Sequence, residues 1–100
     1  MAGISAATLK KKVTIIEKNP IIGKKILVSG NGNCNLTNAS LDSTKYHGDK
    51  VFIGKIFKQF NNKDLIIFFK DLMVELKEER FGRIVPVNEQ AITILDALSD

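Results

Sequence analysis

Hydrophobic and polar residues form blocks along the first third of the chain, and these blocks predict one helix followed by two strands. Residues 2–11 are rich in alanine and end in lysines, which favours a helix because cations suit its carbonyl end. Residues 13–16 are a continuous β-branched run, typical of a strand buried on both faces of a parallel sheet. Residues 25–29 predict a second short strand, and it ends in the Gly/Asn turn of residues 30–33.

The middle of the chain changes from a polar connection to helical periodicity. Residues 36–50 are polar and irregular, and we expect an ordered connection over a ligand site. Apolar residues at helical spacing predict a helix over residues 51–60. A second helix, capped by Asn61 or Asn62, is predicted to run to about residue 77.

The last quarter of the chain predicts a hairpin and a final helix. Phe81-Gly82 separates two candidate strands within residues 75–87, which is typical of a hairpin. Asn88 can cap a helix over residues 89–98. No linker or repeat separates these parts, so we treat residues 1–100 as one domain, and both of its ends look like the interior of a larger protein.

Composition limits the classes of function. The chain of 100 residues is 44% hydrophobic and 26% charged, as in ordinary globular domains, and it has no apolar run near the ~20 residues that cross a bilayer. Its net charge of +4 comes from scattered lysines, which fits a solvated surface with an anion site better than nucleic-acid binding. A single cysteine fits the reducing cytoplasm, and without a Cys/His cluster we expect no metal.

Candidate chemistry lies in residues 23–38, which read GKKILVSGNGNCNLTN. Polar, glycine-rich turns that follow strands are common ligand sites in α/β proteins. Just upstream, the predicted strand of residues 13–16 leads into Glu17, and a carboxylate at a strand end can accept hydrogen bonds from a ribose. The two segments together predict a nucleotide site.

Four segments give the chain a family resemblance: AGISAA, VTIIEKN, GKKILVSGNGNCNLTN and GRIVPVNEQA, in this order. With them the chain resembles an N-terminal fragment of the BaiN-type bacterial flavoproteins, also called aminoacetone-oxidase-type FAD-binding enzymes. The resemblance implies an α/β fold, here a partial Rossmann-like FAD domain with parallel strands, flanking helices and a small hairpin near Phe81. It implies FAD as the cofactor, NAD(P)H as a co-substrate and a small organic substrate.

The chain departs from the family pattern at two places. Family members begin with a strand and a G-x-G-x-x-G loop, which would end just before Met1, so the glycine amides that hold the FAD pyrophosphate are expected outside these residues. The family motif G-x-G-R-C-N has arginine where this chain has Asn33. That difference removes a fixed positive charge close to the expected flavin.

The expected cofactor-binding residues fall into three groups. Glu17 would bind the adenosine ribose, and Lys18, Lys24 and Lys25 would neutralise pyrophosphate oxygens. The turn would lie beside the flavin, where glycines allow close backbone approach and short polar side chains offer hydrogen bonds. Its expected members are Ser29, Gly30, Asn31, Gly32, Asn33, Cys34, Asn35 and Thr37.

Each of these roles has a plainer alternative. The lysines and Glu17 can be surface residues, the glycines can form a plain tight turn, and Cys34 can be a small packing residue instead of a redox thiol because no second cysteine accompanies it. No residue in the chain is identified as catalytic.

Three functions remain open from the sequence. The first is an FAD-dependent oxidoreductase, judged for the whole protein. The second is an inactive fragment of an FAD domain that binds the cofactor weakly or not at all. The third and lowest is a small basic nucleic-acid-binding module. If the central strand is absent, the edge of residues 13–16 is exposed, and we expect self-association of the chain.

Overall fold

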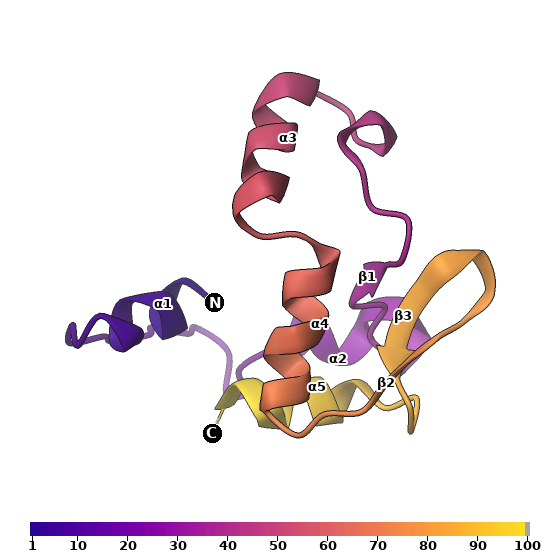
Figure 1. The fold of residues 1–100 in the computed structure, drawn as a ribbon. Helices are drawn as coiled ribbons and strands as arrows, with labels where there is room; N and C mark the ends of the chain where they lie inside the picture. The colour runs from indigo at the N-terminus through magenta and orange to yellow at the C-terminus, as the bar shows by residue number, and fades with distance from the viewer. Residues whose placement is uncertain (100) are drawn as a thin grey trace.

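The computed structural model describes residues 1–99, and it shows five α-helices, three short strands and three 3-10 turns. A central body contains α2, α4, α5 and the sheet, while α1 and α3 extend from it in different directions (Figure 1). The helices are α1 Ala2–Thr8, α2 Lys24–Val28, α3 Lys50–Gln59, α4 Asn62–Asp71 and α5 Ala91–Ser99. The strands are β1 Thr37–Asn38, β2 Leu76–Glu78 and β3 Arg83–Pro86.

Side-chain caps set the starts of α3 and α4, which confirms both predicted helices. The carboxylate of Asp49 accepts hydrogen bonds from the amides of Val51 and Phe52, at 3.0 and 3.1 Å. Asn61 and Asp64 form a reciprocal capping box, so Asn61 is the cap of α4. This helix ends earlier than residue 77, because the chain turns after Asp71.

The turn after α4 explains the early end of that helix. Met73 adopts a left-handed backbone with φ of 66°, which places a helix-terminating conformation two residues after Asp71. The amide of Val74 donates to the carbonyl of Phe69 at 3.0 Å and closes the turn. The chain then enters β2 at Leu76.

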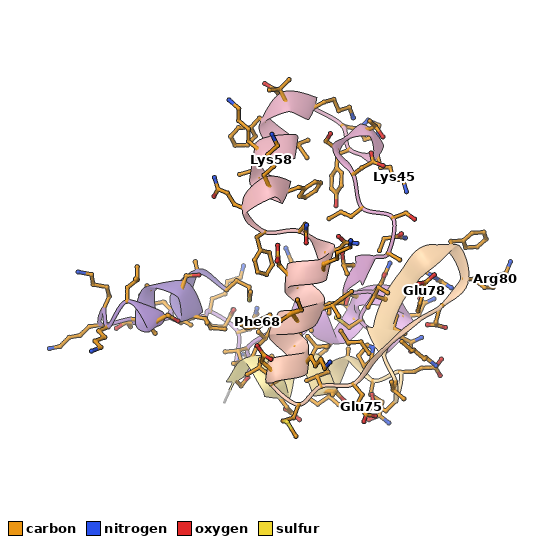
Figure 2. The ribbon with its side chains drawn as sticks, viewed as in Figure 1. Lys45, Lys58, Phe68, Glu75, Glu78 and Arg80 are labelled. Atoms are coloured by element: carbon orange, nitrogen blue, oxygen red, sulfur yellow. The ribbon has the colours of Figure 1, made fainter. Side chains whose placement is uncertain are left out.

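The strands form one antiparallel sheet in the order β1-β3-β2. Leu76 pairs with Pro86 and Glu78 with Ile84, so β2 and β3 form the predicted hairpin around Phe81-Gly82. Glu78 and Arg80 lie at the outer end of this hairpin (Figure 2). The expected parallel strands are not found among residues 1–99, where every strand pair is antiparallel.

Two predicted strands are wrong in the structure. Residues 25–29 fall largely within the helix α2, because Gly23 takes a left-handed conformation and α2 packs against Leu95 of α5. Residues 13–16 form neither helix nor strand, and Ile16 is 93% exposed. A β-branched run needs a neighbouring strand to become part of a sheet, and none of the described strands lies beside it.

The core lies where α2, α4 and α5 meet the segment before β1. It consists of Cys34, Phe69, Val74, Ala91 and Ile94. Phe69 is 1% exposed, and its ring packs edge-on against Phe68, with 5.2 Å between the centroids. Phe68 is labelled on α4 in Figure 2. None of the helices within residues 1–99 has the length and apolar character needed to cross a membrane.

Candidate functional site

The turn of residues 29–35 begins where α2 ends, and local hydrogen bonds fix its shape. The hydroxyl of Ser29 donates to the carbonyl of Ile26 at 2.8 Å, which ties the turn to the helix. The amide of Asn33 donates to the carbonyl of Gly30 at 3.1 Å, and the amide of Cys34 donates to the carbonyl of Ser29 at 3.0 Å. The turn therefore folds back on itself instead of continuing as a strand.

Four residues of the turn have left-handed backbone: Gly30, Asn31, Gly32 and Cys34, with φ of 54°, 56°, 87° and 58°. Glycine and asparagine adopt this conformation most readily, so the Gly/Asn pattern explains most of the turn. A Cβ on Gly30 would lie 2.7 Å from the amide nitrogen of Asn35, closer than real contacts allow. Position 30 thus requires glycine for space as well as for backbone conformation.

The end of the turn is anchored to the hairpin. The amide of Leu36 donates to the carbonyl of Ile84 at 2.9 Å, and the amide of Ala39 donates to that of Gly82 at 2.7 Å. Between them, the side chain of Asn38 donates to the carbonyl of Phe81 at 2.8 Å. The GNGNCNLTN and GRIVP segments, far apart in the sequence, therefore meet at β1 and β3.

Asn62 supports this junction from α4 and was missed as a site-positioning residue by the sequence reasoning. Its side chain is buried, and its amide nitrogen donates to the carbonyls of Asn38 and Ala39, at 2.9 and 3.1 Å. A Cβ on Gly82 would lie 2.6 Å from the side-chain oxygen of Asn38, so Gly82 is also needed for the close approach. The signal in the sequence is a polar residue at the start of an apolar helix, and this pattern alone predicts only a cap.

Cys34 points into the core, unlike its neighbours in the turn. It is 6% exposed and belongs to the cluster with Phe69 and Ile94. Asn31 and Asn35 on either side are exposed. The buried cysteine therefore fastens the turn to the body of the protein while the asparagines face outward.

The charged residues upstream of the turn lie on two different segments, α2 and the exposed segment before it. Lys24 and Lys25 are exposed on α2, directly before the turn, and line a shallow hollow of about 460 Å³ together with Ile21, Leu27 and Val28. Glu17 and Lys18 lie on the exposed segment before α2. One carboxylate oxygen of Glu17 accepts hydrogen bonds from the amide and side chain of Asn19, at 3.0 and 3.1 Å.

The structure therefore brings together the predicted residues from Lys24 to Thr37 on α2, the turn and β1, and it leaves Glu17 and Lys18 on a separate segment. A larger hollow of about 570 Å³, between the end of α4 and β2, contains none of the predicted residues. Residues 1–99 hold no group of three or more His, Cys, Asp and Glu side chains arranged for a metal.

Asp42 is the one described group with a clearly displaced pKa. The side chain of Thr44 donates a hydrogen bond to its carboxylate, and this bond, followed by one from the Thr44 amide, lowers the pKa of Asp42. Asp42 caps the short 3-10 turn Ser43–Lys45, so its carboxylate stabilises the connection between β1 and α3.

Comparison with known proteins places this chain in a family. A model of the HI0933-like protein Rossmann domain matches residues 1–100. The 3-dehydro-bile acid delta(4,6)-reductase of Clostridium scindens is 43% identical over 88 residues, which are 87% of this chain and 21% of that protein. The ribosomal RNA dihydrouridine synthase of Haemophilus influenzae is 30% identical over 79 residues, which are 78% of this chain and 20% of that protein.

The chain spans about a fifth of the length of these relatives. The matches confirm the resemblance to the BaiN-type flavoproteins and the α/β, Rossmann-like class, although the sheet within residues 1–99 is antiparallel. This chain belongs to the family of the HI0933-like protein Rossmann domain.

Proposed function

We propose that the chain supplies the flavin-side part of an FAD site in an FAD-dependent oxidoreductase. The observation that carries this proposal is the turn of residues 29–35, where four left-handed residues are locked between α2, the core and β3. A planar ring needs a rigid surface of main chain without bulky side chains, and Gly30 and Gly32 provide it. FAD itself would accept and donate hydride, while the protein binds and orients it.

The residues around the turn suit different parts of the cofactor. Asn31 and Asn35 are exposed and offer amide groups to the polar edge of the flavin. Lys24 and Lys25, at the hollow of about 460 Å³, are placed to pair with phosphate oxygens. Glu17 keeps the ribose role that the family resemblance implies, and Lys18 beside it is a further phosphate partner.

Asn33 and Cys34 have distinct proposed parts. Asn33 stands where the related motif has arginine, so its neutral amide contributes hydrogen bonds without a fixed positive charge beside the flavin. Cys34 is buried against Phe69, and we assign it the packing role instead of a redox one. In this role the buried Cys34 side chain holds the turn against the core. Ser29 ties the start of the turn to α2, and Thr37 follows the turn in β1, opposite Ile84.

The relatives suggest the type of reaction. One is named as a reductase of a bile acid and the other as a synthase of dihydrouridine in ribosomal RNA. Both names describe formation of a more reduced product, which is chemistry that a flavin performs with hydride from NAD(P)H. We propose the same reaction type for the whole protein to which this chain belongs, with an organic substrate of unassigned structure.

Gel filtration with FAD tests the cofactor proposal. The purified chain is mixed with FAD, and flavin absorbance is followed across the protein peak. Co-elution supports the proposal. Gly30→Val should abolish co-elution because a side chain at this position meets the Asn35 amide. Gly54→Ala is the matched control, since Gly54 lies in α3 with ordinary backbone and no atom closer than 3.9 Å to an added Cβ.

Three results would point elsewhere. A colourless protein peak at all FAD concentrations would leave the alternative that these residues fold but bind the cofactor weakly or not at all. Binding of oligonucleotides that falls steeply as salt increases would instead favour the basic nucleic-acid-binding module. Equal FAD binding by the parent chain and Gly30→Val would remove the turn from the site.

A further inference from the structure

The turn of residues 29–35 contains a reactive dipeptide, Asn31-Gly32, and the sequence has no other Asn-Gly pair. An asparagine before glycine forms a cyclic imide readily, because glycine has no Cβ to shield the attacking nitrogen and its backbone is flexible. The other asparagines precede residues larger than glycine, and Asn19 precedes a proline, which has no amide hydrogen to lose. The sequence therefore singles out Asn31 as a site of spontaneous modification.

Deamidation at this pair proceeds in two steps. The amide nitrogen of Gly32 loses its proton and bonds to the side-chain carbon Cγ of Asn31, while the side-chain nitrogen takes up a proton and leaves as ammonia. Water then opens the five-membered ring at one of its two carbonyls. The product is aspartate or, where the main chain now runs through Cγ, isoaspartate. Either product carries a carboxylate in place of a neutral amide, and water is the only co-reactant.

The folded backbone holds the two reacting atoms apart. Ring closure requires the Gly32 nitrogen and the Cβ of Asn31 to lie on the same side of the Cα–C bond, and this needs a strongly negative ψ at Asn31. Asn31 has φ of 56° and ψ of 37°, so the Gly32 nitrogen lies nearly opposite Cβ across that bond. The reaction therefore cannot start from the observed turn, even though the Asn31 side chain is exposed.

Two hydrogen bonds that span Asn31 oppose its rotation. The amide of Asn33 donates to the carbonyl of Gly30 at 3.1 Å. The amide of Cys34 donates to the carbonyl of Ser29 at 3.0 Å, and the Cys34 side chain is buried in the core. Rotating ψ of Asn31 displaces the residues on either side and breaks these bonds. Ring closure therefore needs local opening of the turn, which costs free energy and is rare in the folded state.

We propose that Asn31 is a latent deamidation site, which the folded turn keeps inert and which reacts when the turn opens. The backbone conformation of the turn, and not the exposure of the Asn31 side chain, sets the rate of the reaction. Isoaspartate adds a methylene to the main chain, so a turn that has reacted in this way does not regain its original hydrogen bonds. The inference rests on main-chain angles and bonds within residues 29–34, and it holds whether or not the turn binds FAD.

Comparison of the folded and the unfolded chain tests the protection. The full chain without FAD is incubated at mildly alkaline pH, with and without guanidinium chloride, and mass spectrometry follows deamidation of the peptide that contains Asn31. The reaction should be at least about tenfold slower without denaturant. Asn31→Gln should remove the signal, because its longer side chain cannot form the five-membered ring. Equal rates under the two conditions, or no reaction in denaturant, would overturn the proposal.

Gly30→Ala loosens the turn without changing the Asn31-Gly32 pair, because its new Cβ would lie 2.7 Å from the Asn35 amide nitrogen. Deamidation of Asn31 should be at least about fivefold faster than in the parent chain in buffer, and equal to it in guanidinium chloride. Gly54→Ala in α3 is the matched control and should react at the parent rate under both conditions. Circular dichroism checks that each variant folds. A folded Gly30→Ala chain that reacts no faster than the parent would show that the turn does not protect Asn31.

Discussion

Replacing Asn62 by alanine should destabilise the chain by removing the support of β1. The Asn62 side chain donates two hydrogen bonds, to the carbonyls of Asn38 and Ala39, and it is 8% exposed. Each bond contributes about 1 kcal/mol net, so their loss costs about 2 kcal/mol. Alanine is a better helix former than asparagine by about 0.5 kcal/mol, which offsets part of the loss. The net decrease in the free energy of unfolding should be about 1.5 kcal/mol.

Urea unfolding followed by circular dichroism measures this difference. Lys63→Ala is the matched control, because Lys63 is the next residue of α4 and is exposed. It should change the free energy of unfolding by less than about 0.5 kcal/mol. Hydrogen exchange at the Leu36 and Ala39 amides, which bond to β3 and the hairpin, should accelerate in Asn62→Ala alone. Equal stability of Asn62→Ala and the parent would refute the role assigned to Asn62.

Four further outcomes follow from the same geometry. Gly30→Ala should lower the free energy of unfolding by about 1 to 3 kcal/mol, because φ is 54° and the new Cβ meets the Asn35 amide. Gly54→Ala should raise it by about 0.5 to 1 kcal/mol, and urea unfolding measures both. The Asp42 carboxyl should titrate below its ordinary pKa by NMR, so its stabilising contribution is present near neutral pH and lost as pH falls through that lowered pKa. Cys34 should react with a thiol reagent much faster in urea than in the folded chain, because it is buried; equal rates would contradict its packing role.

Helices with their own caps and periodicity were predictable from the sequence. Asp49 and Asn61 cap α3 and α4, because their side chains bond amides of the first turn, and such caps act within one turn. The hairpin was predictable for a similar reason, since Phe81-Gly82 takes the left-handed conformations that its turn requires. Local chemistry determines these elements, so local sequence reveals them.

Elements that depend on distant contacts were not predictable. The apolar run before Ser29 looks like a strand, but packing of α2 against Leu95 makes it helical. Residues 13–16 look like a buried strand, yet none of the described strands pairs with them. Within the candidate site, the Gly/Asn turn was evident from its residue types, while the support from Asn62 depends on how α4 meets β1. A short sequence window contains only one of the two partners of such a contact.

If the turn of residues 29–35 binds the flavin part of FAD, the backbone amides of the turn should respond to the cofactor. Titration of the ¹⁵N-labelled chain with FAD, followed by NMR, measures this response. We predict the largest shifts at Gly30, Asn31, Gly32 and Asn35, with smaller shifts at Lys24 and Lys25. Unchanged amides at saturating FAD, or shifts confined to the hollow between Ile66 and Val87, would contradict the claim.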